Sequence, residues 1–280
     1  MKKIMMICLL LSQRSLASVD LQTGAWNWNF HIQGLEVSYS SRSLHHGWWG
    51  QGWCSPLDVT LQKKNGTLQI ERCSVSENTL IESKPDGHFA SKIEGWSYEF
   101  NEDLKIIRAE KDQNKIWIQW HKNEPVWIQI NSENFLVSLN SQNQILALKS
   151  LNSQNLDSEF QYSKGRLVSI STPKDSAPSF RTVFKYDSLD NLVQIQTPDL
   201  KVSIAYNQKD QVQEVLANSN CKTQYRFHSI EQKSTLVQVS SFQQTCKKNP
   251  SVKIKRSLFT KYQIRSGGHL DLISVKETTL

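Results

Sequence analysis

The sequence predicts an all-β protein: an antiparallel sheet of consecutive β-hairpins that curls without closing into a shell. Apolar and polar residues alternate in short segments such as Lys115–Trp120, Val126–Ile130 and Lys201–Tyr206. This alternation turns one face of a strand inward and the other toward water. No stretch of a dozen residues combines the apolar spacing of an amphipathic helix with capping residues at both ends. Both observations favour antiparallel sheet throughout.

The first 17 residues have the layout of a secretory signal peptide. A basic N-terminus precedes the apolar run Ile4–Leu11, and Ser15 and Ala17 place small residues at the −3 and −1 positions of a cleavage site. The apolar run is much shorter than the roughly 20 residues that a membrane span needs. We therefore expect an exported protein, periplasmic, cell-surface or secreted, without a transmembrane anchor.

The charge pattern argues against nucleic acid as a partner. Removal of the predicted signal peptide lowers the formal net charge from +7 to +4, and the remaining basic residues are scattered along the chain. Nucleic-acid binding usually requires a concentrated basic face. We expect no such partner.

Four cysteines follow the predicted signal peptide, and an even number in an exported chain predicts two disulfides. Of the three possible pairings, local geometry favours those in which each pair brackets one predicted hairpin. The first hairpin, Leu57–Ile70, has Asn65-Gly66 at its turn, a strong hairpin signal. A zinc site is the alternative, but no Cys-x-x-Cys spacing or neighbouring histidine pair supports it. The predicted disulfides are Cys54–Cys73 and Cys221–Cys246.

Internal repeats begin near residue 135. The segments Phe160–Ile170, Phe184–Ile195 and Ile204–Val215 align as strand, polar turn and return strand. Their repeat period is the length of one hairpin plus its connection, so each repeat adds two strands. One hairpin is marginal in water, but stacked hairpins cover each other's apolar faces. The tyrosines that end the first strand of each repeat are Tyr162, Tyr186 and Tyr206.

Tryptophan is confined to the N-terminal half, since all nine residues fall between Trp26 and Trp127. We therefore interpret residues 18–130 as a tryptophan-rich N-terminal region and residues 131–280 as the repeat array. No linker rich in Pro, Gly or Ser separates the two, which favours one continuous sheet over independent domains.

The segment Leu35–Trp53 contains the pattern Gly-Trp-Trp-Gly-Gln-Gly-Trp shortly after a tyrosine. Glycines supply backbone conformations that side chains forbid, and tryptophans bury large flat surfaces. This segment, with the repeat Phe-x-Tyr-Asp-x-x-x-x-Leu-x-x-Ile at Phe184–Ile195, resembles the RHS/YD-repeat family of secreted β-sheet proteins. The resemblance implies structural roles for Tyr39, Gly47, Gly50, Gly52, Trp53 and the repeat tyrosines.

The resemblance has limits. Val37 occupies a position where the family often has arginine, and two repeat turns carry Asp-Asn and Asp-Gln in place of glycine. We also expect neither the aspartate-containing core motif nor the variable toxin domain that large family members carry. We therefore do not carry over the encapsulation of a toxin.

Two interpretations of the tryptophans stay open. They either fill the core of the sheet, or a subset lines a strand face and stacks on sugar rings. Trp26 and Trp28 are two residues apart and are expected to point to one side of a strand, and Trp117 and Trp127 are candidates to meet across their predicted hairpin. The candidate ligand-binding residues are Trp26, Trp28, Trp48, Trp49, Trp117 and Trp127.

Catalytic and metal-binding signals are weak. His45 and His46 are adjacent and face opposite ways in an extended segment, which works against a shared metal ion. Asp58, Asp86 and Asp103 are candidates for a hydrolytic carboxylate pair, but turns favour aspartate for local hydrogen bonding in any case. No nucleophile elbow, phosphate-binding loop or Cys-His pattern is present. We expect no enzymatic activity, no metal and no cofactor.

These observations predict a secreted, non-enzymatic β-sheet protein that binds surface glycans or another protein at the cell envelope or surface. One alternative is a structural component of an RHS-type toxin-delivery or contact-dependent system, in which open edge strands pair with an RHS partner. A second alternative is a secreted polysaccharide hydrolase.

Overall fold

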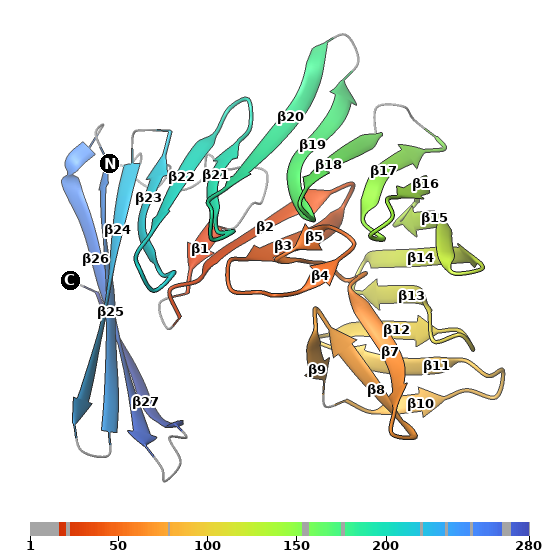
Figure 1. Ribbon diagram of the computed structural model, residues 1–280, viewed down its shortest axis with the longest axis horizontal. Coiled ribbons are helices and arrows are strands. Elements are labelled where there is room, and N and C mark those ends of the chain that lie inside the picture. Colours follow the sequence, from red (N-terminus) through yellow and green to blue (C-terminus); the bar gives the residue numbers. More distant parts are fainter. Residues whose placement is uncertain are drawn as a thin grey trace, which may run out of the picture. The chain divides into compact units, whose positions relative to one another are not determined.

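The computed structural model describes residues 17–20, 23–77, 79–152, 157–174, 177–218, 221–232, 235–246, 249–264 and 270–279. Every regular element in these ranges is a β-strand, and from β10 to β27 each strand neighbours the next in one sheet, largely as antiparallel hairpins (Figure 1). The predicted all-β class and its consecutive hairpins are therefore confirmed. Since the described residues form no helix, they hold none that is long and apolar enough to cross a membrane. Residues 1–16 of the predicted signal peptide lie outside the described part.

The chain forms two compact units, each described separately below. The first contains Trp28–Arg181, and the second contains Ser18–Asn27 and Thr182–Leu280. This division lies elsewhere than the boundary that we expected at residue 130. There, β15 (Glu124–Ile130) and β16 (Glu133–Leu139) form one hairpin inside the first unit.

The first unit begins with short strands. β3 (Leu35–Ser40) pairs with β2 (Trp26–Ile32) on one side and with β6 (Trp53–Cys54) on the other. The backbone φ angles of Asn65 (50°) and Gly66 (81°) are both positive at the predicted turn between β7 and β8, as a two-residue type I′ turn requires. The other short elements are β4 (His46–Gly47), β5 (Gly50–Gln51), β7 (Val59–Lys64), β8 (Thr67–Arg72) and β9 (Val75–Glu77), whereas Ser18 and Val19 of β1 (Ala17–Val19) belong to the second unit.

The larger sheet of the first unit is a meander in which each strand pairs with the next. Ile116 and Ile118 of β14 are buried and pair with Ile130 and Ile128 of β15, and each such side chain contributes roughly 1.5–3 kcal/mol on burial. The intervening residues face the opposite side. The remaining strands are β10 (Ile81–Ser83), β11 (Phe89–Ile93), β12 (Trp96–Phe100), β13 (Ile106–Lys111), β14 (Asn114–His121), β17 (Ile145–Ser150), β18 (Ser158–Ser163) and β19 (Arg166–Lys174).

The second unit continues as a meander of hairpins. β20 begins in the first unit and ends in the second. Successive pairing then runs through to the last strand. The strands are β20 (Ala177–Tyr186), β21 (Leu192–Gln196), β22 (Lys201–Tyr206), β23 (Val212–Ala217), β24 (Cys221–Gln232), β25 (Thr235–Cys246), β26 (Asn249–Ile264) and β27 (Leu270–Thr279).

Each repeat tyrosine lies where the register of its hairpin shifts by a β-bulge. The shift occurs at Tyr162, Tyr186 and Tyr206. The hydroxyl of Tyr206 donates to the carbonyl of Leu192 at 3.0 Å, and that of Tyr162 donates to the carbonyl of Ile145 at 2.9 Å. In both cases the acceptor begins the return strand of the preceding repeat. The tyrosine thus joins one hairpin to the hairpin before it.

The residue after the anchor closes the turn. Oδ1 of Asp187 accepts hydrogen bonds from the backbone N–H groups of Leu189 and Asn191 at 2.9 and 2.8 Å, the local bonding that makes Asp and Asn favourable in turns. Oδ1 of Asn101 accepts one such bond, from the N–H of Lys105 at 2.9 Å, after a register shift at Phe100. The repeats therefore start earlier than residue 135, where we had placed their beginning.

Candidate functional site

The segment rich in glycine and tryptophan forms part of the core of the first unit. Trp49 and Trp53 are completely buried. The ring of Trp49 lies 5.2 Å from that of Phe160, and the ring of Trp53 lies 5.0 Å from that of Tyr39. These contacts give the segment a structural role.

The buried carboxylate of Asp58 holds this segment together by hydrogen bonds. Its side chain is fully buried, and its oxygens accept hydrogen bonds from the N–H of Trp48 (2.9 Å), the N–H of Ser55 (2.8 Å) and the hydroxyl of Ser55 (2.7 Å). Nε2 of His45 lies 3.2 Å from Oδ1 of Asp58 but is not aligned for a hydrogen bond. We attach more weight to the three aligned bonds, because hydrogen bonding weakens steeply with poor alignment. Asp58 is therefore a structural anchor and is unavailable to a hydrolytic carboxylate pair.

Close packing explains two glycines of the segment. A Cβ atom on Gly47 would collide with the side chains of His45 and Asp58. Gly52 has a φ of +84°, and a Cβ there would lie 2.7 Å from the ring of Tyr39. Gly50 pairs in register with Arg166 of β19, which attaches the β4–β5 hairpin to the larger sheet.

The first predicted disulfide is present. Cys54 and Cys73 are bonded, with Cα atoms 5.6 Å apart, and the bond joins β6 to the open end of the β7–β8 hairpin. In the second unit, Cys221 is disulfide-bonded and stands directly opposite Cys246 in the β24–β25 register. Since the side chain of Cys246 lies outside the described part, the Cys221–Cys246 bond stays a prediction.

Three candidate tryptophans are too buried to meet a ligand. Trp26 is 3% exposed, Trp28 is 5% exposed, and Trp49 is not exposed. Their rings pack inside the protein, so the core interpretation applies to them. Trp48 is half-buried, and its ring lies edge-on to that of Trp120 at 6.0 Å. We therefore correct the candidate set by removing the three buried residues.

Trp117 and Trp127 lie on the opposite side of the sheet from the buried isoleucines. Trp117 is 38% exposed, and Trp127 is half-buried. Trp117 pairs across the β14–β15 hairpin with Gln129, and Gln119 pairs with Trp127. The four side chains thus form a square, with two indoles on one diagonal and two amides on the other. We name the set of Trp117, Gln119, Trp127 and Gln129 the indole–amide face.

A neighbouring charge pair supports the indole–amide face. The guanidinium of Arg108 lies 4.4 Å from the ring centroid of Trp117, a cation–π distance. Nη2 of Arg108 donates to Oε1 of Glu110 at 2.5 Å. Two interactions therefore hold Arg108 beside the Trp117 ring, and that ring is fixed before any ligand arrives. The sequence pattern alone did not identify Arg108, Gln119 or Gln129.

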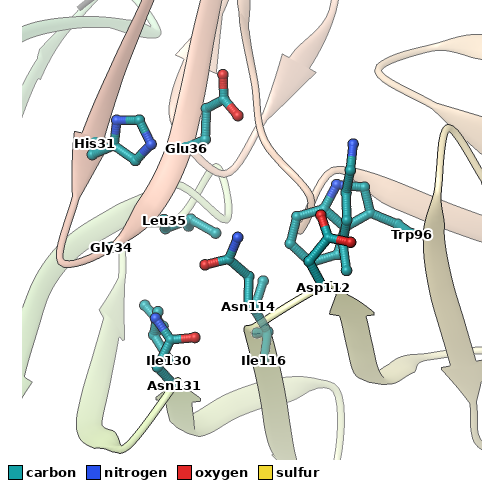
Figure 2. Close-up of a pocket in the computed structure, with 11 residues that line it drawn as sticks. His31, Gly34, Leu35, Glu36, Trp96, Asp112, Asn114, Ile116, Ile130 and Asn131 are labelled. Carbon is teal, nitrogen blue, oxygen red and sulfur yellow. The ribbon is translucent and has the colours of Figure 1, made fainter. Parts of the chain in front are cut away.

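A separate pocket lies where the β2–β3 turn meets the β13–β14 and β15–β16 turns, all in the first unit. Its volume is about 100 Å³, and its mouth is open to solvent. Figure 2 shows His31 and Glu36 on the β2–β3 side and Trp96 and Asp112 opposite them. Asn114, Asn131, Leu35, Ile116 and Ile130 complete most of the wall. The pocket therefore combines an apolar floor with carboxylate, imidazole and amide groups.

The remaining candidates for chemistry are two adjacent histidines and two turn aspartates. His45 is buried and His46 is exposed, and the described residues contain no cluster of three or more His, Cys, Asp or Glu side chains able to hold a metal ion. Asp86 and Asp103 are exposed on two different hairpin turns. Their positions match the local turn role of aspartate.

The sequence matches no known family model and no curated protein. The resemblance to the RHS/YD-repeat family therefore rests on the motifs of the chain itself.

Proposed function

We propose that the chain is an exported, non-enzymatic binding protein of the RHS/YD-repeat type, which binds glycans at the cell envelope or surface through the indole–amide face. The exposed ring of Trp117 carries the proposal. Tryptophan is highly buried on average, yet this ring is 38% exposed in the middle of a regular sheet. Arg108 covers one face of the ring, and we propose that the remaining exposed indole surface packs against the C–H face of a sugar ring.

The rest of the face suits a sugar as well. Gln119 and Gln129 stand beside the indoles in the strand register, and each amide offers both donors and an acceptor to hydroxyl groups. Arg108 fixes the Trp117 ring in advance, and such pre-organisation lowers the entropy lost on binding. Indole surface and flanking amides together provide stacking and hydrogen bonding for the same sugar unit.

The size of the face favours a glycan over a large protein partner. Stable protein–protein interfaces bury about 800 Å² on each partner and involve roughly 20–30 residues a side. Here the aromatic surface is limited to two indoles, next to Leu136, which is 47% exposed and pairs with Trp127. A surface of this extent matches a few sugar units.

Export is supported by the disulfide of the first unit. Cys54 and Cys73 are bonded, and structural disulfides persist in oxidising compartments outside the cytosol. The signal-like N-terminus points the same way.

A glycan array with the mature protein tests the proposal, followed by calorimetry on any sugar that binds. We expect Trp117→Ala to weaken binding by about tenfold or more, equivalent to about 1.4 kcal/mol, and Trp117→Phe to retain part of the affinity. Leu146→Ala is the matched control, since Leu146 is an equally exposed apolar residue (39%) outside the face. Equal affinity of wild type and Trp117→Ala, or no glycan bound by the folded protein, contradicts the proposal.

A further inference from the structure

The pocket of Figure 2 contains a polar group with no partner in the protein. Trp96 is only 9% exposed and lines the pocket, with its ring directed into it. Its ring contacts Tyr98 at 6.4 Å, but its indole nitrogen donates to no group among the described residues. The nitrogen atom itself is not fully buried, so it can donate to a ligand that enters the pocket.

Two carboxylates stand at the same pocket. Glu36 reaches it from β3, where Oε1 accepts a hydrogen bond from Nδ2 of Asn29 at 3.2 Å. Asp112 reaches it from the β13–β14 turn and makes no hydrogen bond or ion pair within the described residues. Lys111 also lines the pocket, but its ammonium donates to the carbonyl oxygen of Glu94 at 3.0 Å. The pocket therefore offers anionic oxygens whose charge is only partly offset.

An organic cation is a suitable occupant for these carboxylates. An ammonium group pairs with carboxylates and also favours the face of an aromatic ring. The amides of Asn114 and Asn131 and the apolar floor of Leu35, Ile116 and Ile130 suit the hydroxyls and C–H groups of a sugar.

We propose that this pocket binds an amino sugar with a free amine. Glu36 and Asp112 face the ammonium group, and Trp96 donates to a ring or hydroxyl oxygen. This inference rests on the proposed glycan-binding function but uses a site separate from the indole–amide face. The pocket then supplies selectivity for aminated units, whereas the face supplies stacking.

The test uses calorimetric titration of the full mature chain with glucosamine, N-acetylglucosamine and glucose. We expect glucosamine to bind about tenfold or more tightly than the other two sugars, because only glucosamine carries a charged amine. In a two-dimensional NMR spectrum, the Trp96 indole N–H should shift with glucosamine. Equal affinity for the three sugars, no binding of any of them, or an unchanged Trp96 signal overturns the proposal.

Variants separate this pocket from the face. Asp112→Asn suits the positive φ of 54° at this position, since Asn and Asp both tolerate it, and should weaken glucosamine binding about tenfold. Glu102→Gln, an exposed carboxylate on another turn, is the control and should change nothing. Leu146→Ala, at an exposed apolar residue outside both sites, should also leave glucosamine binding intact. If Asp112→Asn leaves glucosamine binding unchanged, the pocket assignment fails, while glycan binding by the face is tested separately by Trp117→Ala.

Discussion

Replacement of Asp58 by asparagine tests whether the glycine- and tryptophan-rich segment is a structural core. The fully buried carboxylate accepts three aligned hydrogen bonds, one on Oδ1 from Trp48 and two on Oδ2 from Ser55. An amide has one oxygen, so at least one N–H donor must then face an NH₂ group. Asparagine has nearly the same shape, so packing changes little.

The expected cost follows from those bonds. A hydrogen bond to a charged group is worth about 1.5–3 kcal/mol, and the bonds that survive fall to the strength of neutral ones, roughly half. Asp58→Asn should therefore lower the free energy of unfolding of the first unit by about 3 kcal/mol. This is a large share of the roughly 5–15 kcal/mol typical of a folded domain.

Urea unfolding followed by tryptophan fluorescence measures this change, since eight of the nine tryptophans belong to the first unit. Asp103→Asn is the control, because Asp103 is an exposed turn residue whose substitution should stay within about 0.5 kcal/mol. A loss at Asp58 no larger than that at Asp103 would refute the structural reading of the segment.

Three further predictions follow from single contacts. Gly52→Ala should lower the thermal unfolding temperature more than Gly66→Ala. Both glycines have positive φ, but only at Gly52 would the added methyl group have an atom within 3 Å. An equal drop in unfolding temperature for the two variants would exclude that contact. Tyr206→Phe should lower the stability of the second unit by about 1 kcal/mol, measured by hydrogen exchange, and an unchanged exchange rate would remove the hydroxyl from the repeat-to-repeat link. The hydrogen bond from Lys84 lowers the pKa of Glu99. This carboxylate therefore stabilises the fold above its unfolded pKa, and that stabilisation is lost as the pH falls through its folded pKa. Lys84→Met should raise the Glu99 pKa in an NMR titration, and a constant pKa would contradict this cause.

Local patterns predicted the hairpins because strand alternation and turn chemistry are short-range properties. Asn65-Gly66 marked its turn, and Cys54 and Cys73 marked the hairpin that they close. The earlier repeat at Phe100 escaped notice because phenylalanine takes the place of the repeat tyrosine, although Asn101 makes the same turn bond as Asp187 does to Asn191.

The sites depend on longer-range geometry. Periodicity gives the side of a strand on which a tryptophan lies, but not which side is covered, so Trp28 and Trp117 could not be separated before burial was known. The square of indoles and amides requires the β14–β15 register, which shifts at a bulge between Gln119 and Trp120. The pocket lies between turns that are far apart in sequence, so no local motif predicts it.

The most direct test of glycan binding by the indole–amide face follows the nine indole N–H signals by NMR during titration with an array-selected glycan. The indoles of Trp117 and Trp127 should shift with saturation, while those of the buried Trp26, Trp28 and Trp49 stay in place. Shifts confined to the buried indoles, or a bound glycan that leaves Trp117 and Trp127 unchanged, would contradict it.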